Sequence, residues 1–541
     1  MSKITICKGN IIMTSKGDTT FHTFDGSIVS TAGGSNYWGG EQGTIVGDYQ
    51  PMITSNKLII SDFMIRIRPH SKWEGEFGFD WFRTGDTKRK SDIAFYDILG
   101  RYISDYNKEP VKNDSYTFNF LKDIEQKQDE KGKTKEIIHF GMFNNLIKSF
   151  AQYKISWKTN YSYTVPMLTL LKGKTAKFSF VVETNKNKNN TEVLKEFEKG
   201  LSFEFEKIVE LEKFYRFKTN SLTDPNKTIL TAKYSTKKKD KTIDSNTYLY
   251  DDCLTIECKE EFNTPYKLII KNKDGKICGA MIILPNAPEF KRKIKIALIN
   301  VKTKIYNERE ISARKKEYNY KKNFLINALN QSLIEPEFEK MPELDCSDDF
   351  IEKNCDIDGG GVPRIRGDKK GGLFTYFQKK MEEDINKSFI KFKENETWKY
   401  ENDCYTIFLI DIIYHPMMKD ELLGESYENI SMCYGGANRT TIAHELMHSL
   451  GLNHTFSNFP PHSDTNNNEN LLDFSYRKNK TDNIMDYEDK VFVNGKLLQI
   501  DDFEKISTYH WQWVVINPNL VKLDSKTPIT TNNLFKEISK L

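Results

Sequence analysis

The chain has 541 residues, which is more than one hydrophobic core usually holds, so we expect roughly two to four domains. Charged residues make up 29% of the chain and nearly balance, leaving a net charge of +4. Such a composition argues against a strongly basic nucleic-acid-binding surface and against a strong field toward a membrane.

The N-terminal sequence M-S-K-I-T-I-C-K-G-N lacks the apolar region and the cleavage site of a Sec signal peptide. No apolar run reaches transmembrane length, so no membrane span is expected. The eight cysteines are scattered and do not form a disulfide framework. Cys253 with Cys258, and Cys346 with Cys355, are close enough to pair, but reduced thiols are expected without a signal peptide. We therefore expect a protein that is cytoplasmic or leaves by a route without such a signal.

The first half of the chain reads as strands and turns. Residues 1–55 are rich in Gly, Ser and Thr, which favours short strands with turns or a docking segment. Residues 56–190 predict a β-rich domain, with strand-like runs at Leu58–Arg68 and Lys177–Thr184.

A second β domain is expected at residues 191–290. Its clearest element is the run Tyr266–Leu284, in which Asp274-Gly275 forms a hairpin turn between two apolar stretches. Several short strands over about 90 residues are typical of an immunoglobulin-like sandwich. Such modules carry binding or spacing roles more often than catalysis.

From residue 291 to 541 the pattern alternates between strands and helices, which predicts an α+β domain. Strands are expected at Ile294–Val301, Tyr405–Ile413 and Ile430–Gly436. A helix is expected at Tyr318–Ile334, with Phe324, Leu325, Ala328 and Leu329 on one face. A second helix is expected where apolar residues recur at every fourth position, at Leu373, Phe377, Met381, Ile385 and Phe389. The run Tyr509–Trp513 predicts a terminal helix packed against this domain.

One segment of this domain carries metal chemistry, and it reads H-E-L-M-H-S-L-G-L-N-H. His444 and His448 are four residues apart, so on a helix both imidazoles lie on one face and can bind one ion. Gly451 can adopt the left-handed conformation that ends a helix, which lets the chain bring in His454. Three nitrogen ligands with a fourth position left open are the pattern of a catalytic zinc site. Glu445, beside the first ligand, is placed to act as a general base.

The longer spacing HExxHxxGxxH, followed by N-I-M-D-Y at Asn483–Tyr487, resembles the metzincin zinc peptidases. The Thr-Phe after His454 and the Met-Asp-Tyr are closest to the pappalysin and cytophagalysin branch. The resemblance implies that His444, His448 and His454 bind zinc and that Glu445 is the base. It also implies that Met485 forms the apolar floor of the site and that Tyr487 ligates the metal or stabilises the oxyanion.

By the same resemblance, an edge strand precedes the active-site helix and pairs with extended substrate. Main-chain substrate bonds are therefore expected from Ser431, Met432, Cys433 and Tyr434; an ordinary internal strand is the alternative. Relatives often carry cysteines and acidic calcium ligands between the third histidine and the Met-turn. This chain has instead the polar loop Ser463–Asn470, which puts a calcium requirement in doubt.

Other polar residues near the motif are expected to have ordinary roles. His415 and His462 flank it as solvated loop residues. Cys346, Cys355 and Asp368 lie upstream of the motif, but match no zymogen switch, so structural roles are expected for them.

The sequence therefore predicts a multidomain protein with N-terminal all-β domains and a metzincin-type zinc endopeptidase domain. The absent signal and the Gly-rich front end resemble effectors of bacterial contractile injection machines such as type VI secretion. On that reading the protein is a secreted toxin whose partners are a protein substrate, a secretion spike and an immunity or inhibitor protein. Two alternatives are an injection-machine tip or adhesin carrying the metal domain as payload, and a housekeeping cytoplasmic metallopeptidase.

Overall fold

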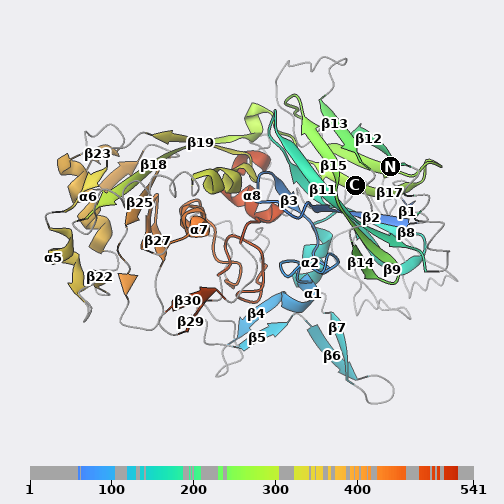
Figure 1. Ribbon diagram of the computed structural model, residues 1–541, viewed down its shortest axis with the longest axis horizontal. Helices are drawn as coiled ribbons and strands as arrows, with labels where there is room; N and C mark the ends of the chain where they lie inside the picture. The colour runs from blue at the N-terminus through green and yellow to red at the C-terminus, as the bar shows by residue number, and fades with distance from the viewer. Residues whose placement is uncertain are drawn as a thin grey trace, which may run out of the picture. The chain divides into compact units, whose positions relative to one another are not determined.

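A computed structural model gives the fold (Figure 1). It describes residues 59–60, 63–103, 119–122, 124–128, 134–138, 142–186, 194, 197, 200–208, 229–235, 241–303, 322–339, 343–347, 349–357, 363–366, 372–384, 390–394, 397–400, 404–410, 412, 414–415, 423–435, 437–458, 474–487, 490–493, 496–499 and 505–521. Lys57–Leu541 forms one compact unit. The docking segment predicted at 1–55 lies outside the described residues. Within the described ranges, no helix is long and apolar enough to cross a membrane.

The first half of this unit is built on a two-sheet β sandwich. One sheet has the order β12-β16-β17-β10-β3 and the other has β13-β15-β11-β2, with β14 paired to β15. Their bounds are β2 (Phe63–Pro69), β3 (Gly78–Asp80), β10 (Met167–Thr169), β11 (Thr175–Thr184), β12 (Ser202–Lys207), β13 (Leu230–Tyr234), β14 (Lys241–Asp244), β15 (Thr247–Cys258), β16 (Tyr266–Lys271) and β17 (Ile277–Ile283).

Apolar side chains from both sheets form the sandwich core. Phe178, Phe180 and Val182 of β11 alternate along the strand and lie in one cluster with Leu268 and Ile270 of β16. Successive side chains of a strand point to opposite faces, so these three lie on the face of β11 that meets the other sheet. The predicted hairpin is confirmed: β16 and β17 are antiparallel, and Gly275 between them has a φ of +75°.

The sandwich corrects the boundary predicted between residues 190 and 191. Strands β2, β3, β10 and β11 precede that position, and they share both sheets with strands that follow it. Residues 191–290 therefore do not form an immunoglobulin-like domain of their own, because their strands find partners among residues 63–184.

Several smaller elements precede residue 291 in the sequence. They are β1 (Ile59–Ile60), α1 (Phe95–Ile98), β4 (Gly100–Ile103), β5 (Asn119–Lys122), β6 (Ile124–Gln128), β7 (Thr134–Ile138), α2 (Met142–Lys148), β8 (Gln152–Ile155), β9 (Lys158–Thr164) and η2 (Pro288–Phe290).

A second sheet, of order β19-β18-β25-β28-β27, organises the region after residue 291. Its bounds are β18 (Arg292–Lys302), β19 (Ile334–Glu339), β25 (Cys404–Ile410), β27 (Gly424–Tyr427) and β28 (Ile430–Cys433), with β20 (Leu344–Asp345) also paired to β18. All pairs in this order are parallel except that of β27 with β28. The strands predicted at Ile294–Val301, Tyr405–Ile413 and Ile430–Gly436 correspond to β18, β25 and β28.

Helices cover both faces of this sheet, because β18 is apolar on both. Ile296 and Leu298 lie in one apolar cluster with α7 (Arg439–Ser449) and a helix over 322–330. Ala297 and Ile299 lie in a second cluster with α5 (Phe350–Asn354) and α6 (Gly372–Asp384). The four residues predicted to share a face of the helix at 322–330 all lie in the first cluster.

Four further strand pairs and two terminal helical elements complete the described region. They comprise β21 (Cys355–Ile357), β22 (Pro363–Arg366), β23 (Ile390–Glu394), β24 (Thr397–Tyr400), β26 (Tyr414–His415), β29 (Lys490–Val493), β30 (Lys496–Gln499), α8 (His510–Ile516) and η5 (Pro518–Val521). The predicted helix ending at Phe389 is described only to Asp384.

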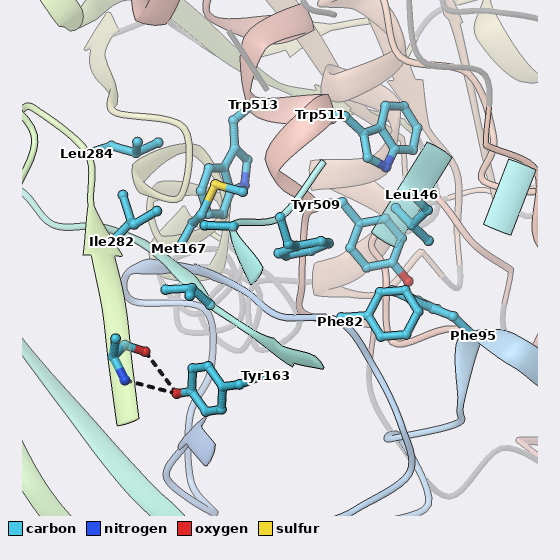
Figure 2. Packing of buried hydrophobic residues seen from close by; sticks show 14 of the residues in the cluster. Phe82, Phe95, Leu146, Tyr163, Met167, Ile282, Leu284, Tyr509, Trp511 and Trp513 are labelled. Atoms are coloured by element: carbon cyan, nitrogen blue, oxygen red, sulfur yellow. Dashed lines mark hydrogen bonds between the residues drawn. The ribbon is translucent and has the colours of Figure 1, made fainter. Parts of the chain in front are cut away.

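One apolar cluster crosses the boundary predicted at residue 290. Figure 2 shows Met167 and Ile282 of the sandwich in the same cluster as Tyr509, Trp511 and Trp513 of the C-terminal segment. The predicted terminal helix is present as α8, but its tryptophans pack in a core that also holds sandwich residues. The two regions therefore share a hydrophobic core.

Candidate metal centre

Local sequence signals fix both ends of helix α7 (Figure 1). At its start, the Asn438 side chain accepts a hydrogen bond from the Thr441 amide, and the Thr441 side chain accepts one from the Asn438 amide. This reciprocal cap satisfies two main-chain donors that the helix leaves free. At its end, Gly451 has a φ of +100°, as predicted, so the chain turns back directly after the helix that carries His444 and His448.

Hydrogen bonds to main-chain carbonyls orient these two histidines. Nδ1 of His444 lies 2.7 Å from the Ile484 oxygen, and Nδ1 of His448 lies 2.7 Å from the Leu452 oxygen. A carbonyl oxygen can only accept, so each Nδ1 carries the proton and each Nε2 carries a lone pair. Burial, and to a smaller extent His454, lowers the pKa of His444 to about 3, which keeps its ring neutral.

The three predicted ligands converge through these Nε2 atoms. Nε2 of His448 lies 3.0 Å from Nε2 of His444 and 3.1 Å from Nε2 of His454. Within the described residues, these histidines form the one group whose ligand atoms could hold a metal ion. The Phe456 ring stacks on His454 at a centroid distance of 4.8 Å and fixes the third ligand.

This arrangement fits a zinc ion. Zinc–nitrogen bonds of about 2.0–2.1 Å at tetrahedral angles place two ligand nitrogens about 3.3 Å apart, close to the separations found here. Two lone pairs facing each other at 3.0 Å repel, and a cation between them removes that repulsion. Zinc-bound histidines usually donate their other ring N–H to a carboxylate or a main-chain carbonyl, as His444 and His448 do here.

The predicted Met-turn lies beside the ligands and is tied to them. Met485 is fully buried in the cluster that contains α7. Its carbonyl accepts a hydrogen bond from the Thr455 amide, next to His454, and the preceding carbonyl, of Ile484, holds His444. Met485 therefore lies in the apolar core beside the helix that carries His444 and His448.

Sequence reasoning missed two residues that build this turn. The buried Asp486 carboxylate accepts hydrogen bonds at 2.8 Å from the amides of Asn479, Thr481 and Tyr487. The Asn483 side chain accepts from the Met485 amide and donates to Gln512. Both belong to the N-I-M-D-Y signature, and the preference of Asn and Asp for bonding nearby main-chain amides was the signal that could have identified their role.

Tyr487 is also close to the ligands. Its ring centroid lies 4.6 Å from that of His454 and 5.8 Å from that of His444. Lys478 places its ammonium nitrogen 5.0 Å from the centroid of the Tyr487 ring. The phenol is therefore at the rim of the histidine cluster, where it can reach a molecule bound there.

Glu445 is buried against the edge strand β27. Burial raises the pKa of its carboxyl to about 8. The negative charge of Glu425 also raises this pKa, whereas the hydrogen bond from the Ser426 hydroxyl, whose oxygen lies 2.8 Å from Oε2, lowers it. A group with a pKa near neutrality can both take up and release a proton.

The edge position belongs to β27 and not to the predicted segment Ser431–Tyr434. Ser431, Met432 and Cys433 lie on β28, which pairs with β25 on one side and β27 on the other. Their main-chain groups are used inside the sheet, so the internal-strand alternative is the correct one. Tyr434 follows the strand, and its amide donates to the Leu423 oxygen.

The remaining candidates stand apart from the histidine cluster or cannot be placed. Cys346 and Cys355 are buried, form no disulfide among the described residues and pack in the apolar cluster with residues of α5 and α6. His415 lies on β26. His462, Asp368 and Ser463–Asn470 lie outside the described residues.

No protein-family model matches the chain, and no curated protein sequence matches it. Among solved structures, the chain is similar to a crystal structure of archaemetzincin from Methanopyrus kandleri. The two are 10% identical, and the match covers 42% of this chain and 97% of the archaemetzincin chain with a TM-score of 0.21.

Proposed function

We propose that the protein is a zinc-dependent endopeptidase. The convergence of three histidine Nε2 atoms beside a buried glutamate carries the proposal. A zinc ion held by His444, His448 and His454 would supply a Lewis acid that makes water more acidic and polarises a carbonyl oxygen. Hydrolysis by a metal ion and a general base needs no serine or cysteine nucleophile. The reaction therefore proceeds by direct attack of water on the peptide carbonyl.

The side chains divide the proton transfers between them. Glu445 accepts a proton from the attacking water and delivers it to the leaving amide nitrogen. Tyr487, at the rim of the histidine cluster, donates its phenolic hydrogen to the oxygen of the tetrahedral intermediate. Asp486 and Asn483 hold the turn that places both Tyr487 and the carbonyl bonded to His444.

The outer edge of β27 is the place where an extended substrate would bind. Within the described residues β27 is the last strand of its sheet, and an extended peptide would add to the sheet there as a further strand. Delivery by a contractile injection system, and the spike and inhibitor partners that it requires, stay predictions from the sequence.

Removing and restoring the metal tests this function. Protein stripped with a chelator is expected to lose hydrolysis of a fluorogenic peptide library and to regain it when about one zinc ion per chain is added back. Magnesium serves as the control, because it prefers oxygen ligands and octahedral geometry. Tight binding of one zinc ion without any hydrolysis would contradict the proposal.

A further inference from the structure

The edge strand β27 turns alternate residues toward helix α7. Gly424 and Ser426 are two positions apart, so they lie on the same face of the strand. Both contact Glu445. The residues between and after them have other neighbours: Glu425 accepts a hydrogen bond from the Tyr434 hydroxyl, and Tyr427 packs near Phe374 of α6. One face of β27 therefore packs against the Glu445 side chain.

Gly424 leaves the space that the glutamate side chain occupies. A Cβ atom at this position would lie 2.5 Å from Cγ of Glu445, 2.7 Å from Oε1 and 2.8 Å from Cδ. Side-chain carbons do not approach this closely, so any larger residue would push the carboxylate away. A positive φ is not the reason for glycine here, since Gly424 is not among the described residues with that conformation.

Ser426 holds the carboxylate in that space. Its Oγ lies 2.8 Å from Oε2 of Glu445, 2.6 Å from the main-chain oxygen of the same residue and 3.2 Å from Oγ of Ser431. The hydroxyl has one proton, and a carboxylate is the strongest acceptor among these three. With Oε2 bonded to Ser426, Oε1 lies beside Gly424.

We propose that β27 sets the position of the general base, with Ser426 as a positioning residue and Gly424 as the space that admits the carboxylate. This inference rests on the function proposed above. Its consequence is that losing either contact reduces the chemical step and spares metal binding, because neither residue touches the three histidines in the described contacts. A displacement of about 1 Å in a catalytic group can cost roughly 100-fold in rate.

Three substitutions test the proposal, with kcat and KM for a fluorogenic peptide and zinc content as readouts. Ser426→Ala is expected to lower kcat by about 10- to 100-fold with KM nearly unchanged, and Ser426→Thr, which keeps the hydroxyl, to restore part of that loss. Gly424→Ala is expected to lower kcat at least as much. Zinc content is expected to stay at about one ion per chain in all three.

The matched control is Ser149→Ala. This change removes a buried hydroxyl that donates to the Leu146 oxygen and contacts neither Ser426 nor Glu445 in the described contacts, so kcat is expected to stay close to that of the unsubstituted protein. A crystal structure of Ser426→Ala gives a readout independent of turnover. The Glu445 carboxylate is expected to occupy a different rotamer from the one seen in the unsubstituted protein.

The outcomes separate the two claims. Unchanged kcat in both Ser426→Ala and Gly424→Ala, or losses that follow a loss of zinc, would overturn the role of β27 and leave the peptidase standing. If the unsubstituted zinc-loaded protein cleaves nothing, the proposed function fails. In that case an unmoved carboxylate in the Ser426→Ala crystal overturns the role of β27, and a displaced one supports it.

Discussion

Replacing Glu445 with Gln is expected to lower kcat for peptide hydrolysis by about 100- to 10,000-fold, the contribution typical of a general acid–base group. Glutamine has nearly the same shape, so it fills the space beside Gly424 and can still bond to Ser426. An amide cannot accept the proton of the attacking water. Steady-state kinetics together with zinc analysis by mass spectrometry measure the effect.

Glu428→Gln is the matched control, because Glu428 is an exposed residue in the turn between β27 and β28. That variant is expected to keep the original kcat. A Glu445→Gln protein with undiminished kcat would exclude Glu445 as the base. Loss of zinc along with activity would instead assign Glu445 a role in metal binding.

The largest expected effect on stability comes from Arg83, a buried cation that joins the sandwich to the C-terminal segment. Its Nη1 lies 2.6 Å from Oδ1 of Asp80, and its Nη2 lies 3.4 Å from Oδ1 of Asp482. The guanidinium also lies 3.9 Å from the centroid of the Trp81 ring. Asp80 in turn bonds to Nδ1 of His510 at 2.6 Å.

Replacing Arg83 with Leu leaves two buried carboxylates without their main cation. Burial by itself raises the pKa of Asp80, and it is the His510 hydrogen bond and the Arg83 charge that hold this pKa below its usual value. Breaking a buried ion pair by removing one partner costs about 3–5 kcal/mol in the free energy of unfolding. Thermal and urea unfolding of the Arg83→Leu variant measure this loss.

Lys172→Leu is the control for that experiment. Lys172 pairs with Glu260 at 2.8 Å on the surface, and exposed pairs contribute little to stability. Its unfolding midpoint is expected to stay the same within error. An Arg83→Leu protein as stable as the Lys172→Leu protein would show that the buried ion network does not hold the two regions together.

The parts of the fold that the sequence predicted are those set by neighbours along the chain. Helical spacing places His444 and His448 on one face, and Gly451, which tolerates a positive φ, ends the helix. The three histidines could therefore be identified from local sequence alone. The Asp274-Gly275 hairpin is local in the same sense.

The errors come from pairings between distant segments. Strand β11 pairs with β2, about 110 to 120 residues earlier, and with β15, about 60 to 80 residues later, and no local pattern shows which partner a strand will choose. The edge strand β27 went unrecognised because its sequence, G-E-S-Y, is short and has no apolar alternation, as is common for edge strands. The contacts of Gly424 and Ser426 with Glu445 depend on the position of that strand, so the sequence alone did not predict them.

The most direct test of the peptidase maps the new N-termini that appear in a mixed proteome after incubation with zinc-loaded protein, beside the Glu445→Ala variant. We expect internal cleavage sites that share a side-chain preference and occur only with the original glutamate, because hydrolysis needs both the metal and the base. The same set of cleavages from the Glu445→Ala protein, or none from a protein that holds one zinc ion, would contradict a zinc endopeptidase built on His444, His448 and His454.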